Sequence, residues 1–509
     1  MKILNILMLS SVMLLLASCY KDHSNYDYTQ KEVITITGID SFYNKLSQKD
    51  DLIIKPVVTT NMPNPEFEYF WGIYENNAPS GYLQPFDTLT KSKDLEMLVN
   101  RDAKDWVLIF GAKNKKTGFT QLTSSILKVA TDFTRGWYVL KDDGINSDLD
   151  LHTNATSIIP NQVWENVYSQ MNGKKLAGKG VNICFDSRYK SMNGAGSYGA
   201  TRAMYVLSDQ DASVLNVNNL KAIHDFDGLF YSAPTTKSPN AMMVASGGNY
   251  FINNGNMHSL NNIYSSIGLF GNNLLWDINN THYEASKYYL THNGANPYIF
   301  DNVSSTFKYV AITGQIMTAV ADASSTQMKS SNNNKKALYI GLKANSPFTG
   351  IAIFQDKSNP AIKLLTTITP STTAFRMVND TISTASKLYN ASMYTVNFVD
   401  ENLIYFVVND REVWSRNLSN GFEQLQYTAA AGETITYLRH KKYTAETAFA
   451  YNYVMVGTQA AGKYKLHMFT KSAGNLATTP AFTLTGNGSV KDVYYLSPSV
   501  TNATYMSSY

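Results

Sequence analysis

The stretch that decides the fold is residues 337–366, ALYIGLKANSPFTGIAIFQDKSNPAIKLLT. It holds three apolar runs, at 337–342, 350–355 and 361–366, separated by Asn345-Ser346-Pro347 and by the polar segment 356–360. Short apolar runs bounded by Asn, Asp, Ser and Pro are typical of antiparallel strands joined by turns. We therefore predict a three-stranded β-meander here.

The same pattern recurs along the chain. Residues 393–418 contain three more runs around the tight Asn409-Asp410 turn, and paired runs occur at 202–217, 242–253 and 451–469. The leading runs repeat about every 53 residues if the long interval between Val244 and Ile340 contains one weak unit. Recurrent meanders predict a β-propeller over residues 135–509, with six to eight blades and seven favoured. The alternative is two or three stacked β-sandwiches.

The region before the propeller, residues 32–131, has shorter strand-like runs separated by turns. This spacing predicts an immunoglobulin-like β-sandwich, and the lack of paired cysteines favours the PKD or fibronectin kind, which usually acts as a spacer. We expect Trp71 in its core, with ligand stacking as the alternative. The predicted fold class is therefore all-β, an immunoglobulin/PKD-like sandwich followed by a propeller.

One segment is predicted to be helical. Val163, Val167 and Met171 recur every fourth residue, and Pro160 precedes them, as at the start of many helices. We expect this helix to pack on the first blade, with Trp164 in the core.

The N-terminus is predicted to be a lipoprotein leader. Residues 1–18 combine a basic start, an apolar run and small residues, which is typical of a secretory signal. The end of this leader, Leu16-Ala17-Ser18-Cys19, resembles the bacterial lipobox, which implies lipidation of Cys19. The alternative is an ordinary cleaved signal with a chance cysteine. Residues 19–31 are polar and suit a tether to the membrane.

Composition excludes several classes of protein. The net charge is +4 with 16% charged residues, so a nucleic-acid binder is not expected. The two cysteines, Cys19 and Cys184, are too few for a zinc cluster, and no disulfide framework is predicted. No run after the leader reaches 18 apolar residues, so the lipid is the expected membrane attachment.

Catalytic and metal-binding motifs are weak. Residues 194–199 match Gly-x-Gly-x-x-Gly but precede a strand-like run, so no helix N-terminus faces a phosphate. The acidic turn Asp142-Asp143-Gly144 lacks EF-hand spacing and is best explained by turn geometry. We expect no catalytic residues, metal or cofactor. A glycosidase would need two carboxylates about 5–10 Å apart in the central pocket, which the sequence leaves open.

Two tryptophans are candidate ligand-binding residues. Strict alternation places Trp414 on the polar face with Glu412 and Arg416, where it offers a platform for a sugar or covers a neighbouring blade. Trp276 lies in the Asn-rich stretch 249–302, which is rich in amide donors and acceptors. The basic run 439–442 is either a solvated turn or a contact for an anionic ligand or lipid headgroups.

A set of short segments occurs in a characteristic order. They are Cys19, Asn25 to Tyr28, Val33 to Ile39, Lys116 to Gly118, Gly136 to Leu140, Asp143 to Asp150 and Leu229 to Pro234. Their order resembles the PKD-like family lipoproteins of Bacteroidetes. The resemblance implies an accessory lipoprotein beside SusC/SusD-type uptake systems, and it provides no catalytic residues.

The expected function is non-catalytic binding of glycan or peptide at the outer-membrane surface, for a TonB-dependent importer of the SusC/SusD type. Asp22, just after the lipidated cysteine, resembles a surface-export signal of this group. The alternatives are a surface hydrolase that uses the propeller cleft and an adhesive lipoprotein that recognises another protein.

Overall fold

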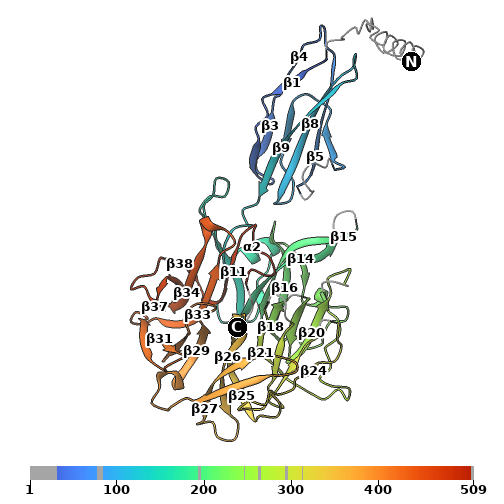
Figure 1. Ribbon diagram of the computed structural model, residues 1–509. Coiled ribbons are helices and arrows are strands. Elements are labelled where there is room, and N and C mark those ends of the chain that lie inside the picture. The colour runs from blue at the N-terminus through green and yellow to red at the C-terminus, as the bar shows by residue number, and fades with distance from the viewer. Residues whose placement is uncertain are drawn as a thin grey trace, which may run out of the picture. The chain divides into compact units, whose positions relative to one another are not determined.

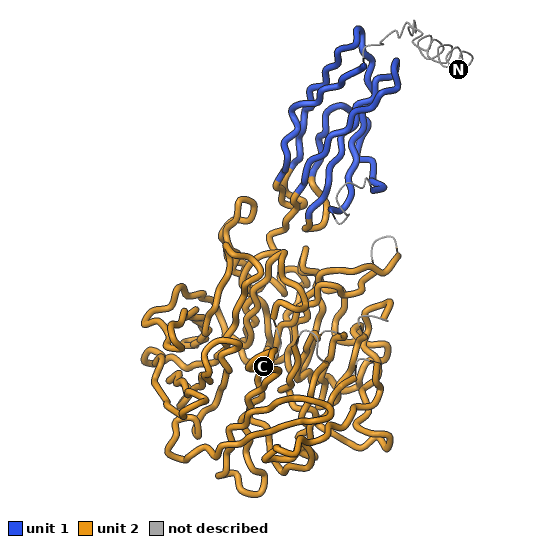
Figure 2. Tube along the Cα trace, viewed as in Figure 1, with its two compact units in different colours: residues 1–43, 51–98, 105–127 blue, residues 44–50, 99–104, 128–509 orange. Residues whose placement is uncertain are grey.

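The computed structural model describes residues 31–505 except 77–83, 193–195, 246, 262–264, 293–295 and 312 (Figure 1). Cys19, the leader and most of the tether lie outside these residues. The chain forms two compact units, drawn in different colours in Figure 2. Unit 1 covers residues up to Tyr43 with 51–98 and 105–127, and unit 2 covers 44–50, 99–104 and 128–509. Within the described residues, no helix is long and apolar enough to cross a membrane.

The N-terminal unit is a β-sandwich. One sheet has the order β2 (Phe42–Leu46), β9 (Thr120–Ala130), β8 (Asp105–Asn114), β5 (Phe67–Glu75), β6 (Asp87–Thr90). The other strands pair as β1 (Ile34–Thr37) with β4 (Val57–Thr60) and as β3 (Asp51–Ile54) with β7 (Leu95–Leu98). Trp71 is 1% exposed, its Nε1 donates to the Lys93 carbonyl at 3.0 Å, and its ring lies 4.8 Å from that of Phe110. The prediction that Trp71 is a core residue is confirmed.

The second unit is a β-propeller. Seven antiparallel sheets follow one another in the part of the chain that the structure describes, and we number them as blades one to seven. Blade one contains β12 (Val163–Trp164), β11 (Asn146–His152), β10 (Gly136–Asp142) and β39 (Ser489–Leu496), and β13 (Leu176–Ala177) pairs with β11. Blade two contains β14 (Gly180–Met192), β15 (Tyr198–Ser208), β16 (Ala212–Asn216) and β17 (Ala222–Asp225). Blade three contains β18 (Pro239–Val244), β19 (Gly248–Asn253) and β20 (Asn256–Asn261).

The remaining blades have four strands each. Blade four contains β21 (Ala285–Leu290), β22 (Tyr298–Asp301), β23 (Thr306–Tyr309) and β24 (Thr318–Ala319). Blade five contains β25 (Lys335–Asn345), β26 (Phe348–Asp356), β27 (Lys363–Thr369) and β28 (Arg376–Thr381). Blade six contains β29 (Ala391–Val396), β30 (Leu403–Val408), β31 (Glu412–Asn417) and β32 (Glu423–Thr428). Blade seven contains β33 (Thr434–Tyr443), β34 (Tyr451–Ala460), β35 (Lys463–Phe469) and β38 (Phe482–Asn487).

The innermost strand of each blade contributes to a closed ring around the axis. In ring order the inner strands are β39, β14, β18, β21, β25, β29 and β33, and β33 lies beside β39 again. Blade one is built from both ends of the unit, because β39 pairs with β10 from Gly136↔Leu496 to Asp142↔Ser489. The predicted all-β class, a sandwich followed by a propeller, is confirmed.

Burial between blades explains the apolar runs in the sequence. Every residue of β10 and of β30 is buried, because neighbouring blades cover both faces of these strands. The outermost strand β38 instead alternates between half-buried and exposed residues. The meander predicted at 337–366 is confirmed as β25, β26 and β27. The long interval before Ile340 contains blade four.

The predicted helix is largely wrong. Only α2 (Val167–Asn172) is helical, and Trp164 lies in the short strand β12, opposite Leu151. Asn166, with φ of 54°, separates the strand from the helix. Pairing with β11 therefore outweighs the helical spacing of the apolar residues. The Trp164 ring, 5.4 Å from that of Phe133, is half-buried against the core as expected.

Candidate ligand-binding channel

A cavity of about 710 Å³ lies on the inner side of the blades, and we call it the wide chamber. Its volume is within the range of about 300–1,000 Å³ that is usual for small-ligand sites. Every inner strand contributes to its lining. One residue from each, in ring order, is Lys491, Gly180, Asn240, Lys287, Tyr339, Tyr394 and Arg439.

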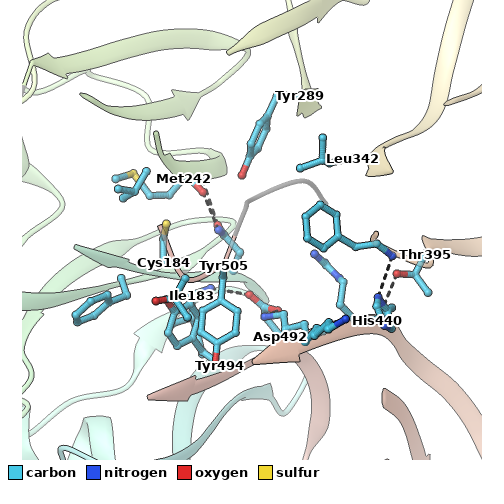
Figure 3. A pocket seen from close by; sticks show the side chains of 18 of the residues that line it. Ile183, Cys184, Met242, Tyr289, Leu342, Thr395, His440, Asp492, Tyr494 and Tyr505 are labelled. Atoms are coloured by element: carbon cyan, nitrogen blue, oxygen red, sulfur yellow. Dashed lines mark hydrogen bonds and ion pairs between the residues drawn. The ribbon is translucent and has the colours of Figure 1, made fainter. Parts of the chain in front are cut away.

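A second cavity of about 100 Å³, the narrow chamber, is lined by adjacent segments of the same strands (Figure 3). Tyr339 and Arg439 line both chambers. On β33, residues 436–439 line the wide chamber and residues 439–442 the narrow one, so the strand runs from one to the other. The two chambers therefore adjoin along the propeller axis, with Arg439 in the lining of both.

The C-terminal segment lines the narrow chamber. Asn502 donates to Asp186 Oδ1 at 3.0 Å and accepts the N–H of Ser187 at 2.6 Å. The Tyr505 hydroxyl donates to the Tyr495 carbonyl at 2.9 Å. Figure 3 shows Tyr505 beside Tyr494, next to Ile183 and Asp492. These bonds hold the segment against blades one and two.

An ion pair lies deep in the narrow chamber. Lys441 Nζ is 3.7 Å from Asp492 Oδ1 and also donates to the carbonyl of Val493. Burial lowers the pKa of Lys441, and the charge of Asp492 opposes this effect. Asp492 Oδ2 also accepts the N–H of Ile183 at 2.9 Å. The pair therefore serves to hold β33, β39 and β14 together.

Two other reactive side chains of this chamber are held neutral. Burial raises the pKa of Cys184 to about 12, so its thiol stays protonated and is a poor nucleophile. Burial lowers the pKa of His440 to about 4. His440 Nδ1 accepts the N–H of Phe398 at 3.1 Å and Nε2 faces Asn452 Oδ1 at 2.7 Å, which fits a proton on Nε2.

Among the described lining residues of the wide chamber, three are cations: Lys287, Arg439 and Lys491. The enclosure of the cavity and the charge of Arg439 both lower the pKa of Lys287. The Arg439 guanidinium carbon lies 6.0 Å from the centre of the Tyr437 ring. Tyr339 lies 5.7 Å from Tyr288 on one side and 5.7 Å from Tyr394 on the other. The lining thus combines positive charge with a row of tyrosines.

The predicted binding tryptophans lie elsewhere. Trp276 is only 6% exposed, because its ring stacks on Tyr283 at 5.4 Å and Lys308 Nζ lies 4.4 Å from its centre. Burial thus corrects the expectation that Trp276 offers a binding face. Trp414 is half-buried on the polar face of β31, as its alternation predicts. Its Nε1 donates to Glu412 at 2.8 Å, and Lys387 Nζ lies 4.9 Å from its centre.

The basic run 439–442 is part of the inner strand β33, so the interpretation as a solvated turn is wrong. Lys287 and Tyr339 were missed because only ring closure brings their strands together. Asp142 and Asp143 accept backbone N–H groups of their own turn, as the turn geometry requires. No group of three potential metal ligands occurs among the described residues.

The fold defines a class of protein in which a β-sandwich is followed by a β-propeller. Residues 19–180 match the PKD-like family, which confirms the PKD-like part of the predicted resemblance. Comparison with curated protein sequences finds no match.

Several solved structures are similar at low sequence identity. A quinonprotein alcohol dehydrogenase-like protein from Bacteroides thetaiotaomicron has 12% identity and a TM-score of 0.41, covering 90% of this chain and 97% of its own. A DUF4784 family protein from Bacteroides caccae has 9% identity and a TM-score of 0.26, covering 77% and 95%. The WD40 domain of SCAP from fission yeast has 10% identity and a TM-score of 0.32, covering 63% and 74%.

Proposed function

We propose that this protein is a lipoprotein, anchored through Cys19 at the outer-membrane surface, whose propeller binds a glycan or peptide without converting it. In this proposal the sandwich is a spacer, and the bound ligand is passed to a TonB-dependent transporter of the SusC/SusD type. The observation that carries the proposal is the wide chamber, to which all seven inner strands contribute.

The lining of the wide chamber favours binding over catalysis. Tyrosine rings and asparagine amides contact sugar or peptide groups through flat faces and paired donors and acceptors. Reactive groups of the adjoining narrow chamber already have partners within the protein. Lys441 pairs with Asp492, and His440 bonds to Asn452. This arrangement suits a site that recognises a ligand.

The partner is tested by affinity purification. A tagged chain is recovered from gently solubilised outer membranes, and bound proteins are identified by mass spectrometry. We expect a SusC/SusD-type pair with the natural chain and its loss with Cys19→Ala, which cannot be lipidated. Recovery of the chain without a transporter would contradict the accessory role.

Ligand binding is tested separately. The purified chain is incubated with panels of glycans and peptides, and both binding and product formation are measured. Saturable binding with no product is the expected result. Release of a product would instead identify a hydrolase, and binding of neither panel would favour the adhesive alternative.

A further inference from the structure

A further cavity, of about 350 Å³, lies on blade three, and we call it the amide cleft. It is lined by residues 232–236, by Asn253, Asn254, Asn256 and His258 around the turn between β19 and β20, and by Asn272 and Asn273. The described lining contains no Asp, Glu, Lys or Arg, and five of its side chains are asparagine amides. Hydrogen-bonding groups without fixed charge therefore dominate this cleft.

His258 offers one acceptor to the cleft. The residue is 5% exposed, and its ring lies 5.0 Å from that of Phe230. Nδ1 lies 3.0 Å from the Gly271 carbonyl, which only accepts, so Nδ1 carries the proton. Burial lowers the pKa of His258, so the ring is neutral at pH 7. Within the described part of the chain Nε2 has no hydrogen-bond partner, so it is an acceptor that a ligand in the cleft can use.

Three amides of the cleft are also unused. Asn254, Asn272 and Asn273 are exposed, and their side chains make no hydrogen bond with the residues that the structure describes. Each amide can donate and accept at once. Together with His258 they present paired donors and acceptors to a ligand, as sugar hydroxyls require.

One side of the cleft is held in place by the protein itself. Asn253, 2% exposed, donates from Nδ2 to the Thr236 carbonyl and accepts the N–H of Ser238 at Oδ1, both at 2.8 Å. The N–H of Tyr231 donates to the Phe270 carbonyl at 3.1 Å. Tyr231 directly precedes the lining segment and is 63% exposed, so an aromatic side chain is available beside it. Tyrosine combines an apolar ring with a polar hydroxyl, which suits contact with a sugar.

The backbone of β20 is already paired at the cleft. The carbonyls of Met257 and Ser259 accept the N–H groups of Leu274 and Gly271 at 2.7 and 3.2 Å. The N–H of Met257 donates to the Tyr283 hydroxyl at 2.9 Å. A peptide therefore cannot extend the sheet here as an added strand. Recognition at this cleft has to use side chains, which favours a sugar over a peptide.

We propose that the amide cleft binds an uncharged oligosaccharide. His258 accepts a hydrogen bond from one sugar hydroxyl, Asn272 and Asn273 bond to others, and Tyr231 packs on a sugar ring. This site is distinct from the wide chamber that carries the proposed function, so either site can fail its test without the other.

The test is calorimetric titration of the full chain, purified in detergent, with maltotetraose, cellotetraose and mannotetraose. His258→Asn keeps an amide that can donate to the same carbonyl but removes the acceptor. A double variant, Asn272→Ala with Asn273→Ala, removes two exposed amides. Asn254 is left unchanged because it also lines the wide chamber. The matched control is Asn279→Ala, because this exposed amide makes no hydrogen bond with described residues and lines neither cavity.

Thermal melting verifies that each variant is folded, and the double variant decides alone if His258→Asn is not. We expect at least one tetrasaccharide to bind saturably, at least fivefold more weakly in each cleft variant and within twofold in the control. Since the lining has no fixed charge, added sodium chloride should leave the affinity unchanged.

Three results would overturn the inference. Equal binding by all variants would place the sugar outside the cleft, which contradicts this site but supports the proposed function. Binding of none of the three sugars would exclude the cleft as a site for uncharged glycans, while transporter recovery would still test the proposed function. Tighter binding of an uncharged peptide of Ser, Asn and Gly would contradict the sugar class.

Discussion

At the scale of single residues, buried polar groups fix strands of the propeller in place. His440 accepts a backbone N–H from the segment after β29 and faces Asn452 on β34, so one imidazole joins blades six and seven. Lys141 and Asp150 form a pair at 2.7 Å with almost no exposure, between β10 and β11. Such groups are stable only when every partner is present.

His440 gives the fold a pH dependence. Its folded pKa of about 4 lies below its ordinary value of 6.5, so acid protonates the unfolded chain first. The contribution of neutral His440 to the free energy of unfolding is complete above about pH 6.5. It is lost as pH falls toward 4, by roughly 3 kcal/mol in all. We expect His440→Gln to be less stable at pH 7 but to lose less stability between pH 7 and 4.5 in urea unfolding. His282→Gln, at an exposed position, should show the natural slope.

Asp150→Asn tests the buried ion pair. The new amide would direct N–H groups at Lys141 or at the Tyr464 hydroxyl, which donates to Asp150 at 2.9 Å in the natural chain. An uncompensated buried cation costs about 3–5 kcal/mol. Chemical denaturation should show a loss of that size in the propeller. Asp227→Asn breaks an exposed pair with Lys237 and should cost no more than about 1 kcal/mol; similar losses for both would contradict our interpretation.

At the scale of elements, one arginine makes three further contacts with the C-terminal segment. The Arg202 guanidinium, on β15, donates to the carbonyls of Ser497, Pro498 and Val500 at 2.7, 2.8 and 3.2 Å. It also lies 4.9 Å from the centre of the Phe185 ring. A planar fork is needed to reach three carbonyls at once, so the contact depends on arginine itself.

Arg202→Gln should loosen this segment without unfolding the blades. Losing charge-assisted bonds costs about 2–3 kcal/mol locally. We expect faster hydrogen exchange at residues 497–505, with natural exchange rates in the middle strands of blades four to six. Arg188→Gln on β14 should leave both regions unchanged, and unaltered exchange in the Arg202 variant would show that other contacts hold the segment.

Elements built from local hairpins are predictable from the sequence. The meanders of blades five and six follow from apolar runs and turn residues that are close along the chain. The sequence predicts blade four only from the long interval between Val244 and Ile340, because the last strand of this blade has two residues and its loops are long. The predicted helix is largely wrong because Trp164 pairs with Leu151 of a neighbouring strand. The spacing of apolar residues alone does not reveal this pairing. The channel lining needs the closed ring, so its residues could not be grouped in advance.

At the scale of the whole molecule, ring closure depends on one strand, and this gives the last prediction. Removing residues 489–509 deletes β39, which pairs with β10 and lies between β33 and β14. Val490, Val493 and Leu496 are fully buried in the natural chain, so the strand edges and the apolar surface that they cover would meet water. We expect calorimetry to show no cooperative propeller transition. The sandwich has a core of its own, so a protease-resistant fragment near residues 31–131 should persist.

The matched control for this deletion is a chain that ends at Leu496. It keeps β39 and removes only the segment held by Arg202, so the propeller transition should remain, at a Tm lower by several degrees. The two chains differ only by the eight residues of one inner strand. A difference between their melting transitions therefore measures how much closure of the ring stabilises the propeller. If both chains melted alike, pairing of β39 with β10 would not be what holds the ring together. The stability would then lie in the packing between consecutive blades, as in an open repeat array.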